Sequence, residues 1–249
     1  MIEISNLEKL FNRGQANEVY ALKNINLSVG AKEFVVIVGA NGSGKTSLLN
    51  CISGSILPSS GDIKISGNPV THLPDYKRSK WIARVFQNPL CGTAPDLSIL
   101  NNFRLASLRT SSYGLRIGIN EAFRAKVKEK IASLKMGLEN KIDQPMGTLS
   151  GGQRQALTLL MSVMDEAHIL LLDEPTAALD PRSAETVMKT ADQLIKEYGL
   201  TAILITHNLK EAFQYGSRII QMAEGKIIKD VNSERKSAIQ QTEIYEWFA

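Results

Sequence analysis

Gly39–Thr46 reads GANGSGKT, a phosphate-binding loop with the spacing G-x-x-x-x-G-K-[ST]. The glycines of such a loop let successive backbone N–H groups turn inward around a polyphosphate, and the lysine adds a positive charge. The threonine hydroxyl is a ligand for Mg²⁺. Alone, the loop indicates only a nucleoside triphosphate, because kinases, GTPases and motors share it. The residues that we expect to bind the nucleotide here are Gly39, Asn41, Gly42, Ser43, Gly44, Lys45, Thr46 and Ser47.

The segments around this loop predict a mostly parallel sheet. Phe34–Val38 is an unbroken apolar run rich in β-branched residues, which is typical of a strand covered on both faces. Thr46–Ser53 follows as a helix, and a strand, a loop and a helix in this order are the context that a phosphate-binding loop requires. Ile169–Leu172 and Ala202–Ile205 repeat the apolar pattern of the first strand. We therefore expect all three strands in one α/β core.

Other parts of the chain surround that core. Alternating apolar and polar residues predict a half-buried antiparallel β-arm over residues 1–29 and 61–67. A hairpin is expected over residues 218–229. Asp180 is expected to cap a helix that has a proline in its first turn and a glycine just past its end. A last helix is expected over residues 232–249.

A mostly helical stretch interrupts the sheet after Gln87. Ser98 is expected to cap a helix that begins at the next residue, and residues 120–136 carry apolar side chains at helical spacing. Another helix is expected to run from Gly151 to about Asp165. Residues 109–118 have the composition of a loop, and no function is assigned to them.

A second motif lies in this helical stretch. Leu149–Gln153 reads LSGGQ, in which Ser150 stands at a helix N-cap and is followed by Gly151, Gly152 and Gln153. The LSGGQ motif presents a second set of N–H donors with the positive end of a helix behind them. One phosphate cradle is complete in itself, so two incomplete ones suggest a nucleotide clamped between two subunits.

With these motifs the chain resembles the ATP-binding subunit of an ABC transporter. The resemblance implies one ABC ATPase domain over residues 1–249, with an α/β P-loop core, a mostly parallel sheet and an antiparallel β-arm formed by residues 1–87 and 169–249. Residues 88–168 would form an inserted α-helical subdomain that carries the LSGGQ motif. The residues that carry the resemblance follow the family's order: Tyr20, Gly39–Thr46, Gln87, Leu149–Gln153, Asp173, Glu174, Asp180 and His207.

Candidate site residues follow four strand-like segments of the chain. They are Gly39, Gln87, the pair Asp173 and Glu174, and His207. In an open parallel sheet, ligands bind outside the carboxyl ends of the strands. One fold would therefore bring all of these residues to a single edge, beside the same phosphates.

The resemblance implies a role for each of these groups. Asp173 would hold Mg²⁺ together with Thr46 and Gln87. Glu174 would polarise the attacking water, a general-base role worth ~10²–10⁴-fold in rate. His207 resembles the family's switch histidine, which positions the γ-phosphate and the water. The alternatives are that Gln87 is a solvated loop residue and that His207 is a structural residue at a strand end.

The resemblance also implies how the nucleotide is held. Tyr20 would stack on adenine, which is worth ~1–3 kcal/mol by analogy with base–aromatic platforms; the alternative is a strand aromatic that packs on the β-arm. In a head-to-tail dimer, each ATP would lie between the phosphate loop of one subunit and the LSGGQ motif of the other. Asp180 would cross that interface, and it can serve as the helix N-cap as well.

The composition is that of an ordinary globular protein. The chain has 249 residues, of which 43% are hydrophobic and 22% are charged. No window approaches the ~20 apolar residues of a membrane span, and no secretory signal is recognised at the N-terminus. We therefore expect a cytoplasmic protein that is peripheral on the inner face of the cell membrane. Cys51 and Cys91 are expected to be thiols in a reducing compartment, and the net charge of +4 comes from scattered residues, so no nucleic acid is expected as a partner.

The function that the resemblance implies is ATP hydrolysis that powers transport of a small solute through a separate permease. ATP would close the dimer and hydrolysis would reopen it. The expected partners are a second copy, the permease and an extracytoplasmic substrate-binding protein. Ala156 and Met161 stand where many transporter ATPases carry arginines. This departure resembles a bacterial uptake group whose members are associated with amino acids.

Two other functions fit some of the motifs. A non-transport ABC ATPase would act in DNA maintenance or on ribosomes. The DNA-maintenance proteins insert long coiled coils between the glutamine and the LSGGQ motif, and the ribosomal ones carry two cassettes in tandem, whereas this chain has a short insertion and one cassette. A metabolic kinase would share only the phosphate loop and would leave the LSGGQ motif unexplained.

Overall fold

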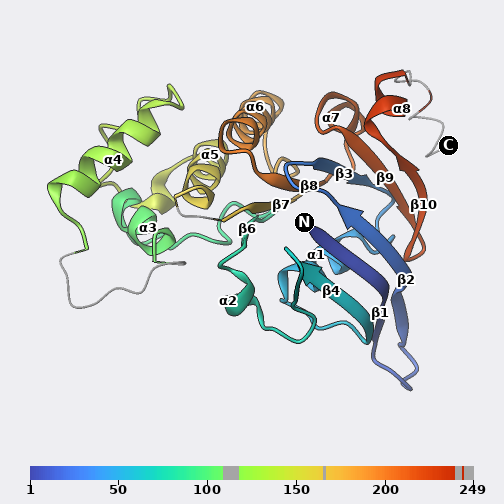
Figure 1. The fold of residues 1–249 in the computed structure, drawn as a ribbon. Helices are drawn as coiled ribbons and strands as arrows, with labels where there is room; N and C mark the ends of the chain where they lie inside the picture. Colours follow the sequence, from blue (N-terminus) through green and yellow to red (C-terminus); the bar gives the residue numbers. More distant parts are fainter. Residues whose placement is uncertain (109–117, 165–166, 239–242, 244–249) are drawn as a thin grey trace.

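The computed structural model of this chain describes residues 1–108, 118–164, 167–238 and 243, which form two sheets and a set of helices (Figure 1). The strands are β1 (Ile2–Phe11), β2 (Val19–Val29), β3 (Phe34–Val38), β4 (Ser60–Ile65), β5 (Asn68–Pro69), β6 (Ile82–Val85), β7 (Ile169–Asp173), β8 (Thr201–Ile205), β9 (Arg218–Ala223) and β10 (Lys226–Val231). The helices are α1 (Lys45–Ser53), α2 (Asp75–Arg78), α3 (Ile99–Ala106), α4 (Glu121–Ala132), α5 (Gly151–Ser162), α6 (Pro181–Tyr198), α7 (Leu209–Gln214) and α8 (Ser233–Ala238), and Met146–Thr148 forms a 3₁₀ turn.

The larger sheet has the strand order β10-β9-β3-β8-β7-β6. Strands β9, β3, β8, β7 and β6 pair in parallel, and β10 adds to the edge as the antiparallel partner of β9. The smaller sheet is antiparallel and has the order β2-β1-β4-β5. The predicted fold class, a mostly parallel α/β core with an antiparallel β-arm, is confirmed.

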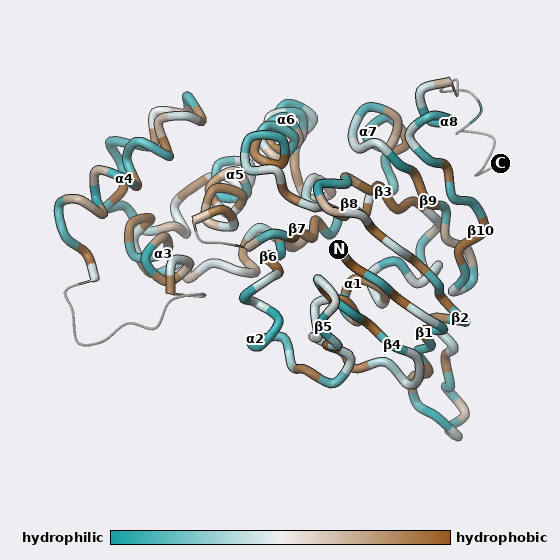
Figure 2. Tube along the Cα trace, viewed as in Figure 1, coloured by the Kyte–Doolittle hydropathy of each residue, from teal (hydrophilic) through white to brown (hydrophobic). Residues whose placement is uncertain are grey.

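Alternate residues of the core strands build two separate hydrophobic clusters. Val36 and Val38 of β3 pack with residues of α5, α6 and α7 on one face of the sheet. Val35 and Ile37 pack on the other face with α1 and with the inner side of the antiparallel sheet. Every residue of β3, β7 and β8 is buried, and the tube of Figure 2 is coloured toward brown at the apolar residues of these strands. This double coverage explains their unbroken apolar sequences.

The helices between β6 and β7 lie within the predicted insertion at residues 88–168 (Figure 1). Ser98 caps α3 as predicted, because its hydroxyl accepts the N–H of Asn101 at 3.1 Å. The predicted helix from Gly151 ends at Ser162, before the expected residue 165, which lies outside the described residues. So do residues 109–117 of the predicted loop, and residues 239–242 and 244–249 of the predicted last helix. The division into a core and a helical subdomain stays a prediction.

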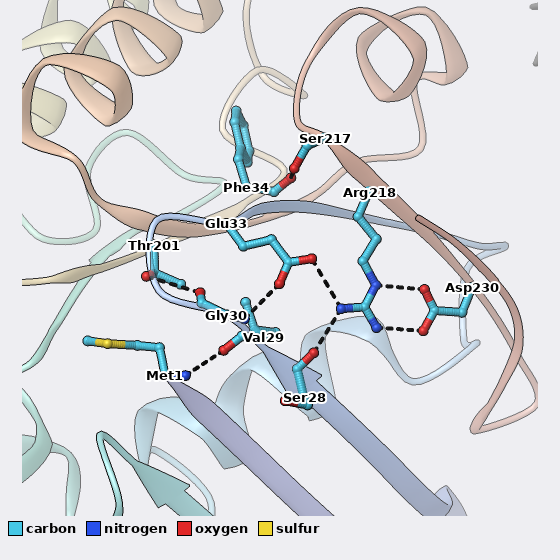
Figure 3. Close-up of polar contacts among 10 residues, drawn as sticks. All are labelled: Met1, Ser28, Val29, Gly30, Glu33, Phe34, Thr201, Ser217, Arg218 and Asp230. Atoms are coloured by element: carbon cyan, nitrogen blue, oxygen red, sulfur yellow. Dashed lines mark hydrogen bonds and ion pairs between the residues drawn. The ribbon is translucent and has the colours of Figure 1, made fainter. Parts of the chain in front are cut away.

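An arginine network ties the antiparallel sheet to the larger one (Figure 3). Arg218 of β9 donates to both carboxylate oxygens of Asp230, at 2.7 and 2.6 Å. Its third nitrogen bonds the carbonyl of Ser28 at 2.8 Å and the carboxylate of Glu33 at 3.1 Å. The hydrogen bonds to Asp230 and Glu33 raise the pKa of Arg218. Beside this network, the N-terminal amine of Met1 donates to the carbonyl of Val29 at 2.8 Å, which fixes the start of β1.

A fully buried arginine on the short helix α2 holds the end of α1. The Arg78 guanidinium donates to the carbonyls of Cys51 and Ile52 at 2.7 and 2.9 Å. It also donates to the carbonyls of Thr71 and Leu73 at 2.9 and 2.8 Å. A cation at the carboxyl end of a helix satisfies carbonyls that have no partner within the helix and complements the helix dipole. Helix α2 was not predicted from the sequence, because a single turn leaves no periodic signal.

No helix in the described parts of the chain combines the length and the apolar character that crossing a membrane requires.

We expect the substitution Arg78→Met to lower the free energy of unfolding by about 3 kcal/mol, because it leaves buried carbonyls without donors. The measurement is chemical denaturation followed by circular dichroism. Lys77→Met is the matched control, because Lys77 is exposed on the same helix; its effect should stay within about 0.5 kcal/mol. Equal stability of the two variants would contradict the role assigned to Arg78.

Candidate functional site

The predicted strand-end residues meet at one edge of the larger sheet. Strands β3, β8, β7 and β6 are successive neighbours, and all four run in the same direction. Their carboxyl ends lead into Gly39, His207, Asp173–Glu174 and Gln87, in that order across the sheet. A cavity of about 670 Å³ opens at this edge. Its lining residues are Gly39, Ala40, Asn41, Thr46, Gln87, Glu174, Ala177 and His207.

Two glycines of the phosphate-binding loop cannot be replaced without displacing backbone. A Cβ atom on Gly39 would lie 2.2 Å from the carbonyl oxygen of Met222. A Cβ atom on Gly44 would lie 2.5 Å from the carbonyl oxygen of Ala21, and the φ angle of Gly44 is 100°. L-residues with side chains avoid that region. These glycines therefore let the loop close tightly against β2 and β9.

Helix α1 begins inside this loop with its amide groups available to an anion. Its N-cap is Gly44, which has no side chain that could bond the first N–H groups of the helix. The first turn contains no acidic residue. Since the positive end of the helix dipole adds to these donors, the start of α1 suits a phosphate group. The Ser43 hydroxyl beside it is buried without a hydrogen-bond partner among the described residues.

The Lys45 ammonium lies over the same loop. Its Nζ donates to the carbonyls of Gly39 and Ala40 at 2.8 and 3.0 Å, and the residue is 4% exposed. Burial lowers the pKa of Lys45, and the nearby Glu174 and Asp173 carboxylates oppose that shift. A phosphate group in the loop would give this buried charge an anionic partner.

A second cavity, of about 500 Å³, adjoins the loop on the side of β2. Tyr20 and Lys23 line it together with Asn41, Ser47 and other loop residues. Tyr20 is 42% exposed, which leaves part of its ring open to a ligand. A hydrogen bond from its hydroxyl to Glu8 raises the pKa of Tyr20 and fixes the outer end of the ring. The position suits a platform for a nucleotide base.

Asp173 and Thr46, two of the predicted magnesium ligands, are in contact. The Thr46 hydroxyl donates to Oδ1 of Asp173 at 3.4 Å. The other carboxylate oxygen, Oδ2, accepts from Nη2 of Arg84 at 2.6 Å. The sequence reading missed Arg84, although a lone arginine within the apolar strand β6 was the available signal.

The donor set fits Mg²⁺ that arrives with a nucleotide. The Thr46 hydroxyl, the Asp173 carboxylate and the Gln87 amide supply oxygen ligands, which Mg²⁺ prefers. Within the described residues, no group of three or more His, Cys, Asp or Glu side chains could hold a metal ion. An ion bound by one carboxylate therefore needs further ligands, and phosphate oxygens are the usual source.

Glu174 and His207 are paired at the mouth of the cavity. The Nδ1 atom of His207 lies 3.1 Å from Oε2 of Glu174. Glu174 has a φ angle of 46°, a left-handed conformation that costs about 1–3 kcal/mol for a residue with a side chain. Its N–H donates to the carbonyl of Ile205 at 3.0 Å, which anchors the strained residue to β8. The carboxylate is thereby held between the phosphate loop and the histidine.

Two buried side chains that the sequence reading passed over hold the backbone around these residues. Nε2 of Gln155, on α5, donates to the carbonyl of Phe86 at 2.8 Å and to that of Pro175 at 3.0 Å. These carbonyls adjoin Gln87 and Glu174 in the chain. Glu211 accepts a hydrogen bond of 2.6 Å from the hydroxyl of Thr206, next to His207. The contacts of Gln155 join segments that are distant in sequence, so no local sequence pattern predicts them.

The LSGGQ motif lies apart from the phosphate loop of its own chain. Ser150 and Gln153 form a capping box at the start of α5. The N–H of Ser150 donates to Oε1 of Gln153 at 3.2 Å, and the N–H of Gln153 donates to the Ser150 hydroxyl at 3.3 Å. A Cβ atom on Gly152 would lie 2.6 Å from the Cβ atom of Ser183, so this glycine lets α5 approach α6. Among the described residues, neither Leu149–Gln153 nor Asp180 lines either of the two cavities at the loop.

Asp180 caps helix α6 as predicted. Its Oδ1 accepts the N–H groups of Arg182 and Ser183, each at 3.1 Å. Hydrogen bonds from Ser183 lower the pKa of Asp180. The cap lies beside the LSGGQ motif. A Cβ atom added to Gly151 would lie 3.0 Å from Leu179, and one added to Gly152 would contact Ser183. The structure therefore places these two predicted groups next to each other and the remaining ones around the phosphate loop.

Comparisons with known proteins agree with this geometry. The family model described as "ABC transporter" matches residues 22–177. The tyrosine transport ATP-binding protein of Clostridioides difficile is 38% identical over 100% of this chain and 98% of its own length. The methionine import ATP-binding protein MetN of Protochlamydia amoebophila is 33% identical and covers 92% of this chain, which spans 66% of that protein.

Solved structures show the same fold. A dimeric structure of the ATP-binding cassette MJ0796 bound to ADP and Pi superposes with a TM-score of 0.80 at 30% identity, over 94% of this chain and 99% of that one. The structure of cbiO1 from Clostridium perfringens, described as part of the ABC transporter complex cbiONQ, also gives a TM-score of 0.80, at 26% identity, over 97% of this chain and 92% of that one.

Proposed function

This chain belongs to the ABC transporter family as an ATP-hydrolysing subunit that drives transport, and on that premise we propose that it powers amino-acid uptake through a separate permease. The observation that carries the hydrolytic part of the proposal is the cavity of about 670 Å³ at the sheet edge. It brings the phosphate loop, Gln87, Glu174 and His207 together, as hydrolysis of a bound triphosphate requires.

The chain's own residues supply the binding steps of the proposed reaction. The first amide groups of α1 bind the phosphates, and Lys45 leaves the loop carbonyls to pair with the β- and γ-phosphates. Thr46, Asp173 and Gln87 would hold Mg²⁺, which would neutralise charge on the phosphate oxygens. Tyr20 stacks on the adenine at the rim of the second cavity.

Glu174 and His207 act on the attacking water. The Glu174 carboxylate accepts a proton from the water while the water oxygen bonds to the γ-phosphorus and the bond to the β-phosphate oxygen breaks. The products are ADP and inorganic phosphate. His207, 3.1 Å from Glu174, orients the carboxylate and contacts the γ-phosphate. The left-handed backbone of Glu174 fixes the direction from which the base approaches.

A second copy of the chain completes the site in this proposal. The LSGGQ motif, away from its own phosphate loop, contacts the γ-phosphate of the nucleotide that the other copy holds, and Asp180 crosses the interface. The dimer of the similar cassette that contains ADP and Pi supports this arrangement. ATP at ~1,000 times its dissociation constant stabilises the bound state by ~4 kcal/mol, which is enough to bias closure, and hydrolysis removes the shared charge.

The proposed transport partners are a permease and an extracytoplasmic substrate-binding protein. The chain then lies in the cytoplasm, on the inner face of the membrane. The segment after Gln87 presents exposed leucines at positions 90, 97 and 105, which suits contact with another protein. Relatives named for tyrosine transport and methionine import support an amino acid as the cargo.

We expect Glu174→Gln to reduce ATP hydrolysis by ~10²–10⁴-fold, because the amide cannot accept the proton of the attacking water. The variant should still bind MgATP and should elute as a dimer in size-exclusion chromatography. Lys45→Ala is the control that removes nucleotide affinity and should elute as a monomer. A Glu174→Gln protein that stays monomeric with MgATP would contradict ATP-driven closure.

We expect loss of this chain from cells to lower the uptake of radiolabelled tyrosine or methionine, because the permease is then without its source of energy. The wild-type chain should restore uptake and the Glu174→Gln chain should not. Unchanged uptake of every amino acid tested in the deletion strain would refute the proposed cargo class, while leaving ATP hydrolysis untouched.

A further inference from the structure

Arg84 is a buried cation beside the nucleotide site, and the predicted site does not include it. It lies on β6 opposite Leu171 of β7. Its side chain is 11% exposed, and that of its partner Asp173 is 10% exposed. An ion pair this buried is held in one geometry, unlike the mobile pairs of a protein surface.

The contacts of the guanidinium all come from elements that build the nucleotide site. Nη2 donates to Asp173 at 2.6 Å, and Nη1 donates to the side-chain oxygen of Asn50 on α1 at 2.7 Å. The guanidinium carbon lies 4.7 Å from the centre of the Phe86 ring, next to Gln87. The buried Nε atom has no hydrogen-bond partner among the described residues. Nη1 and Nη2 thus hydrogen-bond to residues of the nucleotide site, whereas Nε donates no hydrogen bond to the described residues.

The position of Arg84 conflicts with a magnesium ion on the same carboxylate. Thr46 takes Oδ1 of Asp173 and Arg84 takes Oδ2, so both oxygens are engaged before any ion binds. A guanidinium and a divalent ion that share one carboxylate repel each other. The ion therefore binds more tightly when Arg84 weakens or leaves its contact with Asp173.

Space for that movement adjoins the arginine. Arg84 also lines a cavity of about 410 Å³ together with Thr93 and Ala94, which follow Gln87, and with Leu105 of α3 and Met161 of α5. The unbonded Nε atom makes departure from the present position less costly.

We propose, on the basis of the proposed nucleotide site, that Arg84 is a positioning residue that holds Asp173 in the place of magnesium until the metal–nucleotide complex binds. The arginine keeps the carboxylate oriented and charge-balanced while the site is empty of nucleotide. It also sets the concentration of Mg²⁺ at which the site loads, because the incoming ion must overcome its positive charge.

The test is the binding of a fluorescent, non-hydrolysable ATP analogue to the full-length chain at a series of Mg²⁺ concentrations and in EDTA. We expect Arg84→Met to lower the half-saturating Mg²⁺ concentration about tenfold, which is the scale of a screened repulsion between these charges. Affinity in EDTA should stay within about twofold of wild type, because the arginine acts on the metal and not on the nucleotide. Arg84→Lys, which keeps the charge, should remain near the wild-type Mg²⁺ dependence.

Arg124→Met is the matched control. Arg124 also pairs with a carboxylate, Asp143, at 2.7 and 3.1 Å, but on the exposed surface of the helical region. An unchanged or raised half-saturating Mg²⁺ concentration for Arg84→Met would overturn the proposal, and so would an equal weakening with and without Mg²⁺, which signals a damaged loop. Failure of the wild-type chain to bind the analogue would instead refute the proposed function.

Discussion

The chemistry of this chain depends on four parallel strands that end at the same edge of one sheet. Strands β3, β8, β7 and β6 are adjacent and point in the same direction. Each is buried on both faces, so the register of the sheet is set by packing and does not depend on what binds at its edge. The loop, the acidic pair, the histidine and the glutamine therefore converge although they are far apart in sequence.

Locally unfavourable features gather at this edge, and the packed core around it supports them. Glycines at positions 39 and 44 bring the loop against the backbone of neighbouring strands. Lys45 is buried with carbonyl partners, and Glu174 adopts a left-handed backbone. Such features persist only where the surrounding structure determines them, and they are typical of functional sites. Arg84 follows the same pattern as a buried charge on a carboxylate that the site requires.

Much of the fold could be predicted because its signals are local. The apolar run at residues 34–38 and the capping residues Ser98 and Asp180 identified the correct elements. The single-turn helix α2 gave no periodic signal, and α7 was passed over although Asn208 is its N-cap. The supports of the site were missed for a different reason. Arg84 and Gln155 act through partners that are distant in sequence, and no spacing rule reveals such contacts.

The central claim is that each nucleotide is held by two copies of the chain. The most direct measurement mixes Lys45→Ala protein with Ser150→Ala protein and compares ATP hydrolysis with that of each variant alone. In a shared arrangement, a mixed dimer contains one site with both residues intact, so the mixture should be clearly more active than either variant. If the LSGGQ motif instead served the loop of its own chain, every site in the mixture would carry one defect. Activity no higher than that of the separate variants would contradict the account.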